Sequence, residues 1–154
     1  MIMRFLILLT GVLLSGPLES STKNEKTCLA LNIYHEARGE GRIGQLLVGH
    51  VTLNRVEHEN WPNNICQVVY QPNQFSWTRS KNHKIDDQKS WEKIKELSSL
   101  LLRRNFDRSN GALYYINDNK VDKRNHSWLK NLKVVKVHNN HKFFTLDLNR
   151  HRNY

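Results

Sequence analysis

Apolar residues recur every three or four positions along several stretches of this chain, which is the spacing of an amphipathic helix. We expect a polar lead-in at 20–25 and a first helix from Lys26, which ends at Gly39 because glycine favours the position just past a helix. A second helix is predicted over 43–57. Its apolar stripe continues into Asn54, a polar residue on a core-facing line, so we expect hydrogen-bond partners that hold this amide.

The second half of the chain adds one more helix and a small sheet. This helix is predicted over 90–104, with the serine at its start as the N-cap. A strand is expected near Leu113, and the apolar runs at 134–137 and 142–145 flank the turn of a β-hairpin at 139–140. Helices followed by a small antiparallel sheet predict an α+β fold.

Residues 1–20 have the order of a secretory signal, with a basic start at Arg4, an apolar run from Phe5 to Leu14 and small, turn-forming residues after it. The run is too short to span a bilayer comfortably, because a spanning helix needs about 20 residues. We expect this segment to export the protein to the periplasm, cell wall or exterior, either as a cleaved signal peptide or as a retained membrane anchor. Residues 21–154 then form one domain.

The chain has 154 residues, and its 24 Lys and Arg outnumber its 14 Asp and Glu, for a formal net charge of +10. This excess indicates an anionic partner, such as nucleic acid, anionic lipid or an acidic cell-wall polymer. Nucleic acid fits least well, because Lys and Arg are scattered rather than gathered in a stripe and because the export signal opposes it.

The two cysteines, Cys28 and Cys66, exclude a dense disulfide scaffold and a four-thiolate zinc site. In an oxidising compartment they can form one disulfide. The sequence does not show whether their Cα atoms come within reach of each other, so two small buried apolar residues are the alternative.

The densest polar cluster, Y-H-E-A-R-G-E-G at 34–41, lies where the first helix is expected to end. A carboxylate there faces the negative end of the helix dipole, and partial burial against Tyr34 would add to this, so ionisation of Glu36 is disfavoured. A carboxyl group that keeps its proton near neutral pH can protonate a glycosidic oxygen. The simpler alternative is that Glu36 and Arg38 only decorate a helix end.

Known metal and nucleotide motifs do not fit the sequence. His35-Glu36 is similar to the start of a zinc-protease H-E-x-x-H helix, but Gly39 stands in place of the second histidine. The other histidines lack metal-ligand spacing, and the sequence has no P-loop, G-x-S-x-G or dinucleotide fingerprint. We therefore expect no metal and no cofactor.

A series of motifs occurs in order along residues 28–146. The motifs are Glu36-Ala37-Arg38-Gly39-Glu40, Gly44-Gln45, Val51-Thr52-Leu53-Asn54-Arg55-Val56, the segment from Pro62 to Tyr70, Gln74-Phe75-Ser76, Gly111-Ala112-Leu113-Tyr114-Tyr115, Trp128, and Asn140-His141-Lys142-Phe143-Phe144. In these motifs the chain strongly resembles the SleB-type cell wall hydrolases, the spore-cortex-lytic enzyme family.

The resemblance implies a lysozyme-like α+β fold, cleavage of peptidoglycan glycan strands, and a catalytic acid at the Glu of E-A-R, here Glu36. A hydrolytic glycosidase normally uses two carboxyl groups, and we expect the glycines beside Glu40 to carry that residue away. The resemblance also implies a lytic transglycosylase, since members of this family are regarded as such enzymes, and we favour that mechanism. In such an enzyme the C6 hydroxyl of N-acetylmuramic acid attacks C1 of the same sugar, and Glu36 acts first as acid and then as base.

Further residues are expected to bind substrate: Gln74, Ser76, Tyr114, Tyr115 and His141. Gln74 and Ser76 would bond sugar hydroxyl or N-acetyl groups, unless they are ordinary polar loop residues. The tyrosines would stack on or bond the glycan, and one should face the core because neighbours on a strand point oppositely. His141 would buttress the site from the hairpin or be structural, and Asn54 and Arg55 are interpreted as mainly structural.

Other functions stay open at this point. A hydrolytic muramidase or glucosaminidase would need a second carboxyl group, and a wall amidase would usually need zinc ligands. A non-catalytic cell-wall-binding protein would keep the fold and lose the acid, whereas a nucleic-acid-binding domain is the most distant alternative. The expected partners are peptidoglycan glycan strands and anionic cell-wall polymers, with no nucleic acid, and the protein is expected to be a monomer.

Overall fold

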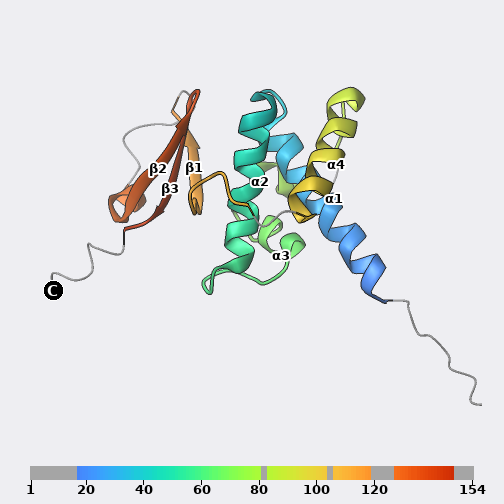
Figure 1. Ribbon diagram of the computed structural model, residues 1–154, viewed down its shortest axis with the longest axis horizontal. Coiled ribbons are helices and arrows are strands. Elements are labelled where there is room, and N and C mark those ends of the chain that lie inside the picture. The colour runs from blue at the N-terminus through green and yellow to red at the C-terminus, as the bar shows by residue number, and fades with distance from the viewer. Residues whose placement is uncertain (1–16, 81–82, 104–105, 119–126, 148–154) are drawn as a thin grey trace, which may run out of the picture.

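The computed structural model describes residues 17–80, 83–103, 106–118 and 127–147 (Figure 1). The predicted α+β fold is confirmed: helices form one part of the molecule and a three-stranded antiparallel sheet forms the other. The apolar run of the predicted export signal lies outside the described residues. Within them, no helix has the length and apolar character needed to cross a membrane.

The first helix, α1, spans Pro17–Ala37, so the prediction of a polar lead-in at 20–25 is wrong. The physical reason is that Pro17 fits the first turn of a helix and no glycine or proline follows until the helix has ended. A tight turn leads into α2, Gly41–Glu57, where Gly41 takes a left-handed φ of 68°. The helix therefore begins slightly before the predicted 43–57.

Shorter elements follow: α3, Ile65–Val69, and a 3-10 turn, η1, at Ser76–Arg79. The next long helix, α4, spans Gln88–Arg103, and the prediction that Ser90 caps it is wrong. Asp87 does so instead, because its carboxylate accepts hydrogen bonds from the backbone N–H of Ser90 at 2.9 Å and from the Ser90 hydroxyl at 2.6 Å.

The helical core is built around α1, which packs against α2, α3 and α4. Leu29 and Ile33 of α1 are fully buried, as are Leu47 of α2 and Ile94 of α4, in agreement with the predicted stripes. Ile43, predicted to begin the stripe of α2, is 48% exposed, so that part of the prediction is wrong. Cys28 and Cys66 form a disulfide that joins α1 to α3, with their Cα atoms 5.2 Å apart.

The sheet contains β1, Tyr114–Asn117, β2, Leu132–His138, and β3, His141–Leu146, in the order β1-β3-β2. The 3-10 turn η3, Ser127–Asn131, leads into β2. The predicted hairpin is confirmed: β2 and β3 pair antiparallel around a turn in which Asn139 has a φ of 50°. Phe143 of β3 is fully buried against α1 and α2, so the sheet shares a core with the helices.

Candidate active site

The Glu36 carboxyl group lies in the last turn of α1 and meets the first strand of the sheet. The hydroxyl of Tyr115 donates a hydrogen bond to Glu36 Oε2 at 3.1 Å. Tyr115 lies on β1 opposite Phe143 of β3, and the two rings are in contact. A carboxyl group of the helical part and a phenol of the sheet part therefore form the centre of the candidate site.

The environment of Tyr115 keeps its phenol protonated. Burial raises the pKa of Tyr115 well above its ordinary value, and the charge of Glu36 and the hydrogen bond to it act in the same direction. The Arg55 guanidinium acts oppositely but does not outweigh them. Tyr115 is thus a permanent hydrogen-bond donor to the carboxyl group, and it orients Glu36.

The strand that carries Tyr115 is held in place by two adjacent residues of α2. Arg55 Nε donates to the carbonyl of Leu113 at 2.7 Å, and Asn54 Nδ2 donates to the carbonyl of Ala112 at 3.0 Å. These carbonyls precede β1 directly, so the two side chains fix where the strand begins. The interpretation of Asn54 and Arg55 as structural agrees with these contacts.

Arg55 is 6% exposed, and burial lowers the pKa of its guanidinium, while the phenols of Tyr115 and Tyr114 act in the opposite direction. The guanidinium lies 5.6–5.9 Å from the ring centres of Trp61, Phe75 and Tyr114. Its Nη1 also donates to Gln74 Oε1 at 3.2 Å. Arg55 thereby joins the loop that carries Gln74 to the start of β1.

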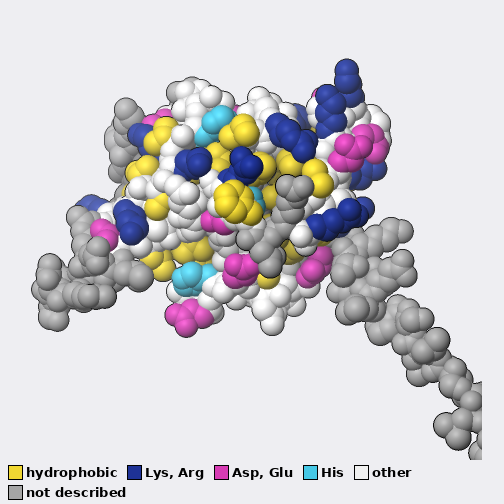
Figure 2. Space-filling view, viewed as in Figure 1, with side chains coloured by type: hydrophobic (Ala, Val, Ile, Leu, Met, Phe, Trp, Pro, Cys, Tyr) yellow, Lys and Arg dark blue, Asp and Glu magenta, His cyan; other side chains and the backbone are white. Residues whose placement is uncertain are grey.

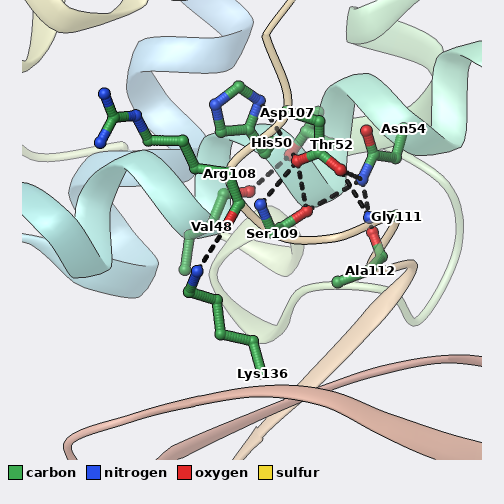
Figure 3. A network of polar contacts seen from close by, with 10 residues as sticks. All are labelled: Val48, His50, Thr52, Asn54, Asp107, Arg108, Ser109, Gly111, Ala112 and Lys136. Atoms are coloured by element: carbon green, nitrogen blue, oxygen red, sulfur yellow. Dashed lines mark hydrogen bonds and ion pairs between the residues drawn. The ribbon is translucent and has the colours of Figure 1, made fainter.

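A second polar network lies where the chain approaches β1 (Figure 3). The Asp107 carboxylate accepts hydrogen bonds from the Ser109 hydroxyl at 2.6 Å, the Ser109 N–H at 2.7 Å, the Gly111 N–H at 2.5 Å and Asn54 Nδ2 at 3.3 Å. Asn54 Nδ2 also lies 3.0 Å from the Ser109 hydroxyl. The predicted partners of the Asn54 amide are therefore confirmed, and they anchor the segment before β1 to α2.

The pKa values of two groups in this network are shifted by their surroundings. Burial alone would raise the pKa of Asp107, but the hydrogen bonds from Ser109 and Gly111 hold it below its usual value. His50 Nδ1 lies 3.7 Å from Asp107 Oδ1 (Figure 3), and burial lowers the pKa of His50 despite that carboxylate. The sequence analysis missed Asp107 and His50, and only the polar D-R-S-N-G run before β1 could have drawn attention to Asp107.

Glu40, which the sequence predicted to be carried away from Glu36 by its neighbouring glycines, contacts the sheet. Its Oε2 lies 3.3 Å from Nδ1 of His141, the first residue of β3. His141 is 5% exposed and lies beside the rings of Tyr115 and Phe143. The structure thus brings His141 next to Tyr115, inside the interface between helices and sheet.

The other residues expected to bind substrate lie on the loop at η1 and at the neighbouring position of β1. Gln74 and Ser76 are exposed, on the loop before η1 and at its start. Tyr114 points away from Tyr115 and contacts the rings of Trp61 and Trp128, with centres 5.7 and 5.9 Å apart. Tyr115 is the tyrosine that packs against the core, as the alternation along a strand predicted.

A ring cluster beside Glu36 was not expected from the sequence. His35 stacks on Trp77, with ring centres 4.6 Å apart and planes at 18°, and His83 and Tyr70 surround Trp77. Burial, together with the nearby His83 and Arg38, lowers the pKa of His35. His35 is therefore held neutral near physiological pH, and the loop bearing Trp77 packs against the same helix end as the catalytic candidate.

Two hollows of about 400 and 440 Å³ lie elsewhere, along α2 and α4. They share His50, Leu101 and Phe106, and neither is lined by Glu36 or Tyr115. Figure 2 shows hydrophobic side chains over these helices, with Lys and Arg in several separate groups. Among the residues that the structure describes, no group of three or more His, Cys, Asp and Glu could hold a metal ion.

Comparison with known proteins shows which family and which relatives this chain is similar to. Residues 39–144 match the family model described as Cell Wall Hydrolase, and the match begins just after Glu36. The chain is 31% identical over 100 residues to the spore cortex-lytic enzyme of Oceanobacillus iheyensis, covering 62% of this chain and 33% of that protein. It is 36% identical over 55 residues to that of Bacillus cereus, covering 36% of this chain and 21% of the relative. The chain thus spans a third or less of the length of these curated relatives.

Solved structures give the same picture over a larger part of the chain. The catalytic domain of the Bacillus cereus SleB protein superposes with a TM-score of 0.66 at 25% identity, covering 80% of this chain and 91% of that one. The catalytic domain of the germination-specific lytic transglycosylase SleB from Bacillus anthracis also gives a TM-score of 0.66, at 24% identity, with coverage of 87% and 100%. The chain therefore belongs to the cell wall hydrolase family, and its fold is that of the SleB catalytic domains.

Proposed function

We propose that this protein cleaves the glycan strands of peptidoglycan between N-acetylmuramic acid and N-acetylglucosamine, as a lytic transglycosylase in which Glu36 is the catalytic residue. The observation that carries the proposal is the position of Glu36. Its carboxyl group ends a buried helix, is partly exposed to solvent, and receives a hydrogen bond from a phenol that stays protonated. Membership of the cell wall hydrolase family gives the substrate class.

The reaction needs one carboxyl group in two protonation states. Glu36 first donates its proton to the glycosidic oxygen as the bond to C1 of N-acetylmuramic acid breaks. The C6 hydroxyl of the same sugar then attacks C1 and loses its proton to the Glu36 carboxylate, which leaves a 1,6-anhydro end. Tyr115 supports the first stage, because a donor to the carboxylate stabilises the charged form that proton donation leaves on Glu36.

The neighbouring carboxylates favour this one-acid mechanism over hydrolysis. A hydrolase would need a second carboxyl group across the scissile bond. Glu40 is paired with His141, Asp118 with Lys142 at 2.6 Å, and Asp107 is bound within its own network. Each of these three groups has a partner that holds it in a structural role.

Sugar binding is assigned to the exposed polar loop and to the aromatic residues at Tyr114. Gln74 is held by Arg55 and, with Ser76, presents polar groups at the loop surface. Tyr114 and the half-exposed Trp128 offer ring surface, on which a sugar face can stack. The net charge of +10 supports action at an anionic cell wall, which also requires export of the protein.

Mass spectrometry of peptidoglycan digested with the protein tests this proposal, with Glu36→Gln as the matched variant. Anhydro-muropeptides from the wild type alone are the expected result. Products with reducing ends would overturn the transglycosylase mechanism in favour of hydrolysis. Intact glycan with both proteins would overturn the enzymatic function, and a non-catalytic wall-binding role would replace it.

A further inference from the structure

We propose that Glu40 is a positioning residue: by pairing with His141 it fastens the sheet, and with it Tyr115, over Glu36. The inference rests on the proposed function of Glu36, but the contact itself does not. Glu40 lies at the turn between α1 and α2, close to Glu36 in sequence, whereas His141 begins β3. One pair of side chains therefore connects the two parts of the molecule that make up the site.

The local environment of Glu40 shows that its side chain is not used for the helix it precedes. Glu40 occupies the N-cap position of α2 and makes no capping hydrogen bond with its side chain. Ser, Thr, Asp and Asn are the preferred residues at that position, and glutamate is not. Glu40 is thus an unfavourable N-cap for α2, and its side chain contacts the sheet instead. A residue that is unfavourable for its own helix but makes such a contact indicates a functional constraint.

The space for this contact is created by Gly44, one turn into α2. A Cβ at that position would lie 2.5 Å from Glu40 Cβ and 3.5 Å from Cδ2 of His138. Even an alanine there would clash with the Glu40 side chain, whereas its contact with His138 of β2 would be an ordinary one. Gly44 lets the Glu40 side chain lie against the helix and lets the β2–β3 turn approach it.

The Glu40–His141 contact influences the position of Tyr115 through the sheet. His141 pairs with Asn117 of β1, two residues from Tyr115 and on the same face, and its ring lies 6.1 Å from the Tyr115 ring. Arg55 and Asn54 hold the start of β1, whereas the Glu40–His141 pair holds the other end of the strand. Tyr115 lies between these attachments, so loosening either one would shift its hydroxyl relative to Glu36.

The low exposure of His141, at 5%, favours this role over direct contact with a sugar. Displacements of about 1 Å in a catalytic arrangement can cost about 100-fold in rate. A positioning residue should therefore affect turnover more than substrate binding. It should also affect the mobility of the β2–β3 hairpin, which is measurable without substrate.

Glu40→Ser is the decisive variant, because serine is a favoured N-cap and cannot reach His141. We expect its thermal midpoint to equal or exceed that of the wild type, while kcat on soluble glycan strands falls at least about 10-fold with KM within about twofold. Amide hydrogen exchange in 138–146 should become faster. Glu40→Gln, which keeps the shape of the side chain, should recover part of the activity, and Glu57→Ser at the far end of α2 is the matched control.

The outcomes separate this inference from the proposed function. Unchanged kcat in Glu40→Ser, or a change confined to KM, would overturn the positioning role. A fall in kcat with unchanged exchange in 138–146 would also overturn it, because Glu40 would then act on the substrate itself. If the wild type releases no product, the proposed function fails, and amide hydrogen exchange in 138–146 alone tests the contact. Faster exchange in Glu40→Ser would support the claim that the Glu40–His141 pair holds the sheet in place, and equal exchange would reject it.

Discussion

Two carboxylates of this molecule, Asp107 and Glu36, lie on either side of the approach to β1 and differ in their surroundings. Asp107 accepts hydrogen bonds from Ser109, Gly111 and Asn54, and those from Ser109 and Gly111 hold its pKa below the usual value although burial acts to raise it. Glu36 lies in the last turn of a helix, next to the negative end of the helix dipole, and it accepts a hydrogen bond from the neutral phenol of Tyr115. The first environment fixes a charge, whereas the second suits a group that gains and loses a proton.

The comparison shows that the density of polar contacts does not identify the reactive group. The network of Asp107, His50 and Ser109 contains residue types found in catalytic sites, yet its contacts are directed at the backbone before β1 (Figure 3). Its effect on the site is indirect: it anchors the segment that places Tyr115. Stability should therefore depend on Asp107, and turnover on Glu36.

The largest effect is expected from Glu36→Gln. The variant keeps the shape of the side chain and removes the transferable proton, so release of glycan fragments should fall at least about 1,000-fold. The free energy of unfolding should stay within about 1 kcal/mol of the wild type, because the Tyr115 hydrogen bond has an acceptor in the amide oxygen. Fragment release is measured by chromatography and unfolding by urea titration. Activity close to the wild type would remove Glu36 from the mechanism.

The opposite pattern is expected for Asp107→Ala. Loss of the carboxylate leaves the Ser109 and Gly111 donors without their acceptor, so the free energy of unfolding should fall by about 3 kcal/mol. Protein that is still folded should lose no more than about 10-fold in activity, because Asp107 acts on the site only through the segment that places Tyr115. Asp118→Ala is the control, because its pair with Lys142 is about 40% exposed and should contribute no more than about 1 kcal/mol. Equal losses in the two variants would contradict the structural role of the network.

More of the fold than of the site could be predicted from the sequence. Helices, hairpin and the turn near Gly41 follow from local patterns, and the buried stripes of α2 and α4 agree with their spacing except at Ile43, which is exposed. The start of α1 was misjudged because residues 17–25 are polar, and polarity alone does not stop a helix. Ser90 and Asp87 are both good N-caps, so only the three-dimensional contact shows which one is used.

Within the site, the sequence placed Glu36 at a helix end but could not show what faces it. The contacts of Tyr115, Arg55 and His141 join residues far apart along the chain. Glu40 is the clearest case: no local pattern indicates His141 as its partner, and Gly44, one helical turn later, provides the room for that contact. Long-range pairings of this kind have no local signature.

Tyr115→Phe should have a smaller effect than either carboxylate variant. The ring still packs against Phe143, but the hydrogen bond to Glu36 is lost, so kcat should fall about 10-fold with a small change in stability. Tyr114→Phe is the matched control, because that hydroxyl is not directed at Glu36. Initial rates on soluble glycan strands measure the difference. A larger loss for Tyr114→Phe would mean that sugar contacts matter more than orientation of Glu36.

The smallest expected effect is the pH dependence that His50 gives to folding. Burial lowers its pKa in the folded state from the ordinary value of 6.5, so the unfolded chain binds more protons as the pH falls below 6.5. The free energy of unfolding should therefore decrease between pH 7.5 and 5, and one pKa unit corresponds to about 1.4 kcal/mol. His35 contributes in the same direction, since its pKa is also lowered, so the comparison needs His50→Gln measured beside the wild type.

Asp107 stays ionised throughout this range, because its pKa lies below its usual value, and it loses its contribution only in stronger acid. Urea titrations at pH 7.5 and 5 should show a smaller pH dependence in His50→Gln, and an equal dependence would mean that Asp107 compensates the burial of His50 in full.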